Sequence, residues 1–328
     1  MKLPNVSVII PTRNRAAQLQ VALRSINRQS LNADGFEILV IDNGSSDSTR
    51  EVARKFRDRL SSLRYFHVEE PGLHVGRHLG LARAANDILV YADDDIRATP
   101  GWLQAIAEAF SDPEVSLVGG NNLPYLKGSA PPWLRKLWSI PSEGGRMIGQ
   151  LSLLSLPPGK RKISPFLVWG CNFSVRKSIV LDAGGFHPDA MPKNLIRFRG
   201  DGETHVSRYV HERGLTCVFD SRASVYHTVS QERMTFEYFR QRAFAQGISD
   251  SYTHLRNPKY GLGSAGMLKL RKTLGKVRNY IKPKFRDGEL QLLIRELDAG
   301  YGEGYRFHQD NYASDPEVRS WTHRQDYF

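Results

Sequence analysis

The stretch DILVYADDDI, residues 87–96, joins a run of apolar and β-branched residues to three consecutive aspartates. The apolar run has the composition and the length of a strand that is buried on both faces. Three carboxylates a few ångströms apart repel one another, so their ionised forms need a positive charge nearby. We therefore expect Asp93, Asp94 and Asp95 to follow a central strand, with a cation among them.

Other apolar runs surround this strand in the sequence. Three of them share its character: VSVII (6–10), EILVID (37–42) and LRYFHV (63–68). Helix-like patterns separate the runs, as in RAAQLQVALRSINRQS (15–30). Such alternation is typical of an α/β fold, in which helices flank both faces of a mostly parallel, Rossmann-like sheet.

The rest of the chain is less regular. Residues 124–165 are rich in Pro, Gly, Ser and Trp, and we expect a functional loop or lid there. FLVWGCNFSVRK (166–177) is expected to form a strand, a turn and then a helix. From about Thr235 the pattern is mainly helical. We therefore expect a catalytic domain over residues 1–230 and a helical, basic extension over residues 231–328.

The composition is that of a globular protein with an excess of positive charge. Of 328 residues 40% are hydrophobic, and the formal net charge is +12, which favours polyanionic partners such as nucleotide phosphates or an anionic lipid surface. Cys171 and Cys217 are too few for a disulfide framework, and the N-terminus lacks the apolar region of a secretory signal. We therefore expect a cytoplasmic protein, either free or peripheral at the inner face of the membrane.

Part of the positive charge belongs to one late segment. Between Ser264 and Arg286 there are eight Lys and Arg and no acidic residue. Apolar residues recur there at helical spacing: Met267, Leu270, Leu274, Val277 and Ile281. A basic amphipathic helix over 265–286 suits either a peripheral membrane contact or packing against the catalytic domain. The aromatic-rich segment 301–328 is a candidate cover over the acceptor side or a homodimer contact.

Polar or loop-forming residues follow each early strand, where open parallel sheets bind their ligands. They are Pro11-Thr12-Arg13, Asp42, Pro71-Gly72 with Arg77 beyond them, and the aspartate triplet. We expect these strand ends to converge on one crevice.

A divalent cation would explain the triplet. Hard cations such as Mg²⁺ and Mn²⁺ take oxygen ligands and are often held by carboxylates together with substrate phosphates. Residues one apart in an extended segment point the same way, so Asp93 and Asp95 are expected to share this task while Asp94 points elsewhere. The alternative is an N-cap cluster for the next helix, but Thr99 and Pro100 are better placed as its cap and first residue.

The order of the motifs resembles a known family. SVIIPTRNR (7–15), LVIDNGSSDST (39–49), YADDDI (91–96) and GGF (184–186) look like the N-terminal domain of inverting family 2 glycosyltransferases with the GT-A fold, over about residues 4–230. The resemblance implies a nucleotide-sugar donor, usually a UDP-sugar, and a divalent metal, Mn²⁺ or Mg²⁺. It also implies transfer to an acceptor hydroxyl, in cell-surface polysaccharide or glycoconjugate synthesis.

The resemblance assigns roles to single residues. It implies a donor site made of Pro11, Thr12 and Arg13 beside the nucleoside, Asp42 at the base, Arg77 near the nucleoside or phosphates, Asp93 at the ribose, and Asp94. Asp95 would bind the metal together with Asp93. His227 is a candidate third ligand or a structural histidine. Trp169, Gly170 and Asn172 resemble the segment beside the sugar and acceptor, where Trp169 either stacks on a sugar or belongs to the core.

A second acidic motif should supply the catalytic base. FRGDGETHVSRYVHERG (198–214) resembles the family's acidic segment at the head of a helix, with Asp201 on the catalytic aspartate and Glu203 on the later acid. Gly200 stands where the family has its first acid. Inversion needs one carboxylate to take the proton of the acceptor hydroxyl. Asp201 and Glu203 both remain candidates, and an ordinary N-cap is the alternative for Asp201.

Other functions fit parts of the sequence. A nucleotidyltransferase also pairs an α/β sheet with carboxylates and a metal, but PTRNRAAQ (11–18) lacks the glycines of a phosphate loop. Nucleic-acid binding is suggested by charge alone, and no recognisable module supports it. A protein that binds the donor without turning it over stays open because of Gly200. The expected partners are a nucleotide sugar and a glycan, lipid-linked or protein acceptor, without nucleic acid.

Overall fold

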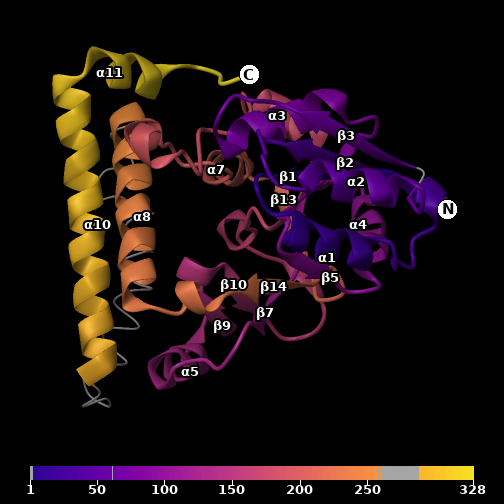
Figure 1. The fold of residues 1–328 in the computed structure, drawn as a ribbon, viewed down its shortest axis with the longest axis horizontal. Coiled ribbons are helices and arrows are strands. Elements are labelled where there is room, and N and C mark those ends of the chain that lie inside the picture. Colours follow the sequence, from indigo (N-terminus) through magenta and orange to yellow (C-terminus); the bar gives the residue numbers. More distant parts are fainter. Residues whose placement is uncertain (1–2, 61, 258, 260–287) are drawn as a thin grey trace.

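The computed structural model of the chain describes residues 3–60, 62–257, 259 and 288–328 (Figure 1). Its largest element is an eight-stranded sheet in the order β11-β13-β6-β12-β4-β1-β2-β3. The strands of this sheet are β1 (Val6–Thr12), β2 (Phe36–Asp42), β3 (Leu63–His67), β4 (Ile88–Ala92), β6 (Val115–Gly119), β11 (Lys160–Lys162), β12 (Asn172–Arg176) and β13 (Thr216–Asp220).

The four early strands form the parallel half of this sheet. β1 pairs with β2 and with β4, and β2 pairs with β3, all in parallel. β6 and β13 are also parallel, whereas β12 and β11 run antiparallel to their neighbours. Every residue of β1 and β4 is buried, which explains why their sequences are continuously apolar. The expected α/β fold is confirmed, with antiparallel strands added to it.

Helices cover both faces of the sheet. They are α1 (Ala16–Ile26), α2 (Thr49–Arg57), α3 (Leu73–Arg83), α4 (Trp102–Phe110), α6 (Lys177–Asp182) and α7 (Thr204–Glu212). Neighbouring residues of β1 belong to different apolar clusters, because successive side chains of a strand point to opposite faces. Val8 packs with Leu23 of α1, whereas Ile9 packs in the cluster that contains Leu81 of α3 and Val206 of α7.

A second, six-stranded sheet lies beside the first, in the order β5-β14-β7-β10-β9-β8. Its strands are β5 (Ile96–Ala98), β7 (Asn122–Leu126), β8 (Pro141–Ser142), β9 (Gly145–Ile148), β10 (Leu153–Ser155) and β14 (Val225–Val229). The prediction of an irregular loop over residues 124–165 is wrong. Besides strands of the second sheet, this stretch contains α5 (Pro132–Ser139) and β11. The strand expected at the start of 166–177 is a 3-10 turn, and β12 follows the turn instead.

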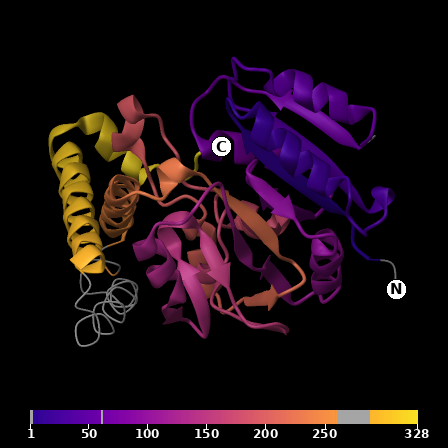
Figure 2. The ribbon, with the colours of Figure 1, turned by 60° about the horizontal axis from the view of Figure 1, so that its bottom comes forward.

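The described residues of the C-terminal third are mainly helical, as expected, and form α8 (Phe236–Arg256), α10 (Gly288–Ser314) and α11 (Pro316–His323). α8 and α10 lie side by side at one edge of the molecule (Figures 1 and 2). Their backbones approach closely: a Cβ on Gly304 would lie 1.9 Å from the carbonyl oxygen of Phe244. Phe239 of α8 and Leu293 of α10 share an apolar cluster with Leu153 of the second sheet. A domain boundary at residue 230 stays a prediction.

Two further expectations concern membranes and cysteines. None of the helices in the described part of the chain has both the length and the apolar character needed to cross a bilayer. The basic helix predicted at 265–286 lies outside the described residues. Cys171 and Cys217 are free and buried, so the expectation that they form no disulfide framework is confirmed.

Candidate active site

The three aspartates follow β4 at the carboxyl edge of the parallel strands. Asp94 points toward the end of β1, where the hydroxyl of Thr12 donates to Asp94 Oδ2 at 2.7 Å. Nη1 of Arg15 lies 3.1 Å from Asp94 Oδ1 and 3.1 Å from Asp95 Oδ2. Arg15 is therefore one cation among the triplet, and the sequence analysis did not single it out.

Asp95 also gathers positive groups from a distant part of the chain. Nη1 of Arg233 lies 3.3 Å from Asp95 Oδ2, and Nε2 of His227 lies 3.2 Å from Asp95 Oδ1. Burial alone would raise the pKa of Asp95, but His227, Arg233 and Arg15 outweigh it, and the pKa lies below its ordinary value. In Asp94 burial is only partly offset by Arg15 and raises the pKa to about 7. Within this pair, Asp95 is the firmly ionised carboxylate.

Asp93, Asp95 and His227 form a candidate metal site, because one ligand atom of each lies within 4.8 Å of the others. Nδ1 of His227 lies 2.9 Å from the carbonyl oxygen of Leu151. A carbonyl only accepts, so Nδ1 carries a proton, and in the neutral ring Nε2 presents a lone pair. That lone pair faces Asp95 Oδ1, a buried atom with no hydrogen-bond donor. This contact needs a positive group between the two atoms, either a proton on Nε2 or a metal ion, and a histidine fixed through its other nitrogen is the usual form of a metal ligand.

Asp93 completes this set. Its carboxylate has no hydrogen bond or ion pair to any residue that the structure describes. Burial and the neighbouring charge of Asp95 raise the pKa of Asp93, and a divalent cation would reverse that effect. The residues present therefore fit a divalent cation with two carboxylates and one imidazole.

Glu203 is held near this cluster by two donors. The N–H of Gly170 donates to Oε1 and Nη1 of Arg77 donates to Oε2, each at 3.0 Å. A Cβ on Gly170 would lie 2.2 Å from Nη2 of Arg77, so a larger residue there would displace the guanidinium. The buried guanidinium of Arg77 interacts with Asp93 as well as with Glu203. The Glu203 side chain is 22% exposed, so it is not closed to solvent.

Asp201 lies in a different environment. Nδ1 of His187 lies 2.6 Å from Oδ1, while Nη1 of Arg208 and the hydroxyl of Thr253 each lie 2.8 Å from Oδ2. The side chain is 4% exposed, and despite this burial Arg208 and His187 hold the pKa of Asp201 well below its ordinary value. Because Thr253 belongs to α8 and Arg208 to α7, Asp201 joins these two helices. Its geometry favours a structural role.

The cap interpretations of two residues are wrong. No side chain caps α7, so Asp201 is not its N-cap. Thr99 does not cap the helix after the aspartates, because α4 begins only at Trp102. The hydroxyl of Thr99 donates instead to the carbonyl oxygen of Ser224 at 2.8 Å. This bond connects the residue after β5 to the residue before β14.

We expect Asp201→Asn to lower the free energy of unfolding by about 3 kcal/mol, because it removes the charge of a nearly closed carboxylate that accepts from His187, Arg208 and Thr253. Urea unfolding of the purified variant measures this loss. Glu212→Gln on the same helix is a matched control, since its ion pair with Lys259 is exposed at both ends and should change stability by about 0.5 kcal/mol or less. Equal stability of Asp201→Asn and the unmodified chain would contradict the structural role.

The side chains of the 169–172 segment are largely engaged within the protein. Asn172 is 2% exposed, accepts from Nε1 of Trp102 at 2.9 Å and donates to the carbonyl oxygen of Ala223 at 2.9 Å. This placement favours a structural role for Asn172. Trp169 is half-buried against the core, with Nε1 donating to the carbonyl oxygen of Phe166. Stacking of Trp169 on a sugar stays a prediction.

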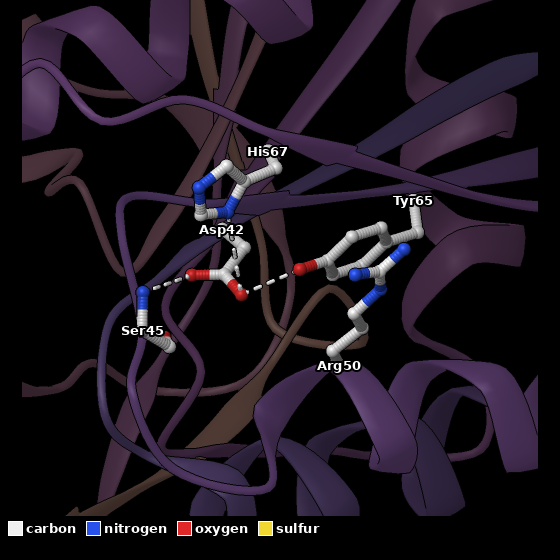
Figure 3. A pocket seen from close by; sticks show the side chains of 5 residues that line it. All are labelled: Asp42, Ser45, Arg50, Tyr65 and His67. Atoms are coloured by element: carbon white, nitrogen blue, oxygen red, sulfur yellow. Dashed lines mark hydrogen bonds and ion pairs between the residues drawn. The ribbon is translucent and has the colours of Figure 1, made fainter.

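A cavity of about 350 Å³ opens at the end of β2 and β3, and is lined by Asp42, Ser45, Arg50, Tyr65 and His67 (Figure 3). The N–H of Ser45 donates to Asp42 Oδ1 at 2.8 Å, and the hydroxyl of Tyr65 donates to Oδ2 at 2.6 Å. Only Asp42 was predicted from the sequence. Tyr65 lies on a predicted strand, but the sequence analysis did not say toward which face of the sheet its side chain points.

The loop after β1 joins this cavity to the aspartates. Pro11 is buried and Arg13 is exposed, with Thr12 between them bonded to the triplet as described. Asn14 has a φ of 52°, in the left-handed region that asparagine tolerates. Its N–H donates to the hydroxyl of Ser45 at 2.8 Å. The donor residues expected from the sequence therefore surround one edge of the sheet.

Comparison with family models matches residues 7–182 to Glycosyl transferase family 2. The chain belongs to this family. The glycosyltransferase AglE of Haloferax volcanii is 37% identical over 219 residues, which cover 66% of this chain and 64% of that relative. The glucosyl-dolichyl phosphate glucuronosyltransferase of the same organism is 21% identical over 308 residues, with 92% of this chain and 95% of that one covered. Family membership favours the glycosyltransferase interpretation over the nucleotidyltransferase one.

A solved structure supports the fold. The mannosyltransferase PcManGT from Pyrobaculum calidifontis, in complex with GDP-Man and Mn²⁺, matches 99% of this chain and 85% of its own, with a TM-score of 0.56. Sequence identity is 16%, so this likeness concerns the fold. The GT-A architecture expected from the sequence is confirmed.

Proposed function

We propose that this chain is a metal-dependent, inverting glycosyltransferase that moves a sugar from a UDP-sugar to an acceptor hydroxyl. The proposal rests on one observation: a candidate metal site and a candidate catalytic base lie close together at one edge of the sheet. Asp93, Asp95 and His227 each offer a ligand atom within 4.8 Å of the others, and Asp95 Oδ1 is buried without a hydrogen-bond partner. Arg77 interacts with both Asp93 and the Glu203 carboxylate, and the Glu203 side chain is partly exposed. In a sugar transfer the first site would receive a metal ion with the donor diphosphate, and the second would receive the acceptor hydroxyl.

Asp93, Asp95 and His227 would hold the metal. When bound, a divalent cation neutralises the donor diphosphate and stabilises the charge on the departing UDP. Two carboxylates and an imidazole suit Mn²⁺ better than Mg²⁺, which prefers oxygen ligands in octahedral geometry. Arg15 and Arg233 limit the repulsion between the carboxylates, and they hold Asp95 in place from two sides.

Glu203 would be the catalytic base. Its carboxylate is fixed by the N–H of Gly170 and by Arg77, while further lone pairs remain available toward solvent. The base takes the proton of the acceptor hydroxyl as that oxygen attacks C1 of the sugar opposite the leaving UDP. Asp201, the other candidate, already accepts from three donors and is nearly closed to solvent, so we assign it no part in proton transfer.

The cavity at Asp42 would take the nucleobase. Uracil presents an N3–H donor between two carbonyl acceptors, which suits a carboxylate at Asp42 flanked by a donor such as Arg50. Cytosine has an acceptor at N3 and would face Asp42 unfavourably. A site that is built to accept a hydrogen bond rejects an analogue without the donor.

A panel of nucleotides tests the donor proposal. Thermal stabilisation and calorimetric affinity should be measured for UDP, CDP and GDP, each with Mn²⁺ and with chelator. With Mn²⁺ present, we expect UDP to bind about 100-fold more tightly than CDP. With chelator, we expect no such preference. Asp42→Asn should reduce this preference, because an amide donates as well as accepts. Preferred binding of GDP would overturn the choice of uracil, although the protein could still be a glycosyltransferase. Binding of no nucleotide would overturn the proposed function.

For the acceptor we propose a lipid-linked glycan, in synthesis of a cell-surface glycoconjugate. The support is the relative named for glucosyl-dolichyl phosphate, together with the net charge of +12, which suits an anionic membrane surface. The cytoplasmic face of the membrane would be the site of action. A homodimer stays a prediction.

A further inference from the structure

The last residues of the chain lie against α3. After α11, residues 324–328 cross back to the first sheet, and the C-terminus lies next to α3 (Figure 1). α3 carries Arg77, which holds Glu203, and the next residue is His78. Residues 324–328, named here the tail segment, contact His78 directly.

His78 connects the tail segment to the loop that follows α6. Nδ1 of His78 lies 2.9 Å from the carbonyl oxygen of Tyr327, and the N–H of Phe186 donates to Nε2 at 2.8 Å. Because Phe186 donates, Nε2 is the acceptor and Nδ1 must carry the proton that bonds Tyr327. The ring of Phe328 packs on His78 with 4.5 Å between centroids. A Cβ on Gly185 would lie 2.9 Å from Cζ of Phe328, so the tail segment contacts this loop directly.

Tyr327 is anchored at both ends. Its side chain is buried, and its hydroxyl donates to the carbonyl oxygen of Trp321 at 2.5 Å while it lies 2.7 Å from the hydroxyl of Tyr252 on α8. The ring also packs edge-on against His74 of α3, with 6.1 Å between centroids. The backbone carbonyl that His78 uses is therefore fixed by a ring that α8 and α11 hold.

From Phe186 the contacts reach the proposed base. Arg77 lies with its guanidinium carbon 5.1 Å from the centroid of the Phe186 ring, and the same guanidinium donates to Glu203. The N–H of His187 contacts the carbonyl oxygen of Gly202, the residue before Glu203, at 3.4 Å. The loop after α6 therefore contacts two neighbours of the Glu203 carboxylate: Arg77, which donates to it, and Gly202, which precedes it in the chain.

We infer that Tyr327 is a positioning residue for Glu203. Through its carbonyl, Tyr327 holds His78 and the Phe186 loop, and these hold Arg77 against the Glu203 carboxylate. This inference rests on the proposed role of Glu203 as the base. It gives the C-terminal helices a task in the reaction, because α8 and α11 supply the anchors of Tyr327.

The amide of Gly170 provides a readout that does not depend on turnover. Its N–H donates to Glu203 Oε1, so its hydrogen-exchange rate reports whether that carboxylate is in place. We expect Tyr327→Ala to raise the exchange rate of the Gly170 amide about tenfold and to lower the rate of UDP release from UDP-sugar by a similar factor. Affinity for UDP with Mn²⁺ should stay within about twofold, since the tail segment contacts neither Asp42 nor Asp95.

Two variants separate positioning from general stability. Tyr327→Phe keeps the carbonyl and the ring that packs on His74 but loses the hydroxyl contacts with Trp321 and Tyr252, so its Gly170 protection and its rate should lie between those of Tyr327→Ala and the unmodified chain. Gln325→Ala lies in the same segment, with a side chain that bonds only the carbonyl oxygen of His323, and should behave like the unmodified chain. Unchanged Gly170 exchange in Tyr327→Ala would overturn the inference. If the unmodified chain releases no UDP, the proposed function fails, while Gly170 exchange still decides whether Tyr327 positions Glu203.

Discussion

Replacement of Glu203 by Gln lowers sugar transfer by about 10³-fold, in the range expected for loss of a general base, and leaves the affinity for UDP and Mn²⁺ almost unchanged. Gln keeps the size of the side chain and can still accept from the N–H of Gly170, but it cannot take a proton. The rate should be measured as UDP released from the UDP-sugar, with the acceptor or with water as the attacking group.

Asp201→Asn is the matched comparison for this result. Asp201 lies two residues away but is closed by His187, Arg208 and Thr253, so its loss should reduce the folded fraction and not the rate per folded molecule. If Asp201→Asn stops transfer in the folded enzyme and Glu203→Gln does not, the assignment of the base is reversed.

Asp95→Asn is expected to remove the metal-dependent part of UDP binding. The loss should equal that which a chelator causes in the unmodified chain, about 100-fold in affinity, since one charged ligand of the cation is gone. Calorimetric titration of UDP with and without Mn²⁺ measures both effects.

Asp94→Asn is the control for this loss. Asp94 follows the same strand but points to Thr12 and Arg15, away from His227, so metal-dependent binding should be retained. Metal-dependent binding by Asp95→Asn equal to that of the unmodified chain would contradict the assigned metal site.

The parallel core could be predicted from the sequence because its strands are buried on both faces. VSVII, EILVID and DILVYA are continuously apolar, and each becomes a strand of the sheet. The second sheet could not be predicted in this way. β10 and β5 are three residues long, and β14 pairs with β7 across about a hundred residues of chain, so no local pattern marks their pairing.

For the site residues, too, local features could be predicted from the sequence, whereas contacts between distant residues could not. The sequence grouped Asp93 with Asp95 and separated Asp94 because neighbouring residues of an extended segment alternate in direction. It could not choose between Glu203 and Asp201, because the deciding partners are remote: Gly170 is 33 residues from Glu203, and Arg77 is 126 residues away. Arg15 and Arg233 were missed for the same reason, since only the fold brings them to the triplet.

The central claim is that a divalent cation joins the aspartate cluster to the diphosphate of the donor. Crystals grown with UDP and Mn²⁺, measured at a wavelength where manganese scatters anomalously, test it most directly. We expect one anomalous peak among Asp93, Asp95 and His227, within coordination distance of a phosphate oxygen of UDP. UDP bound in the cavity at Asp42, with no anomalous peak in that cluster, would contradict the claim.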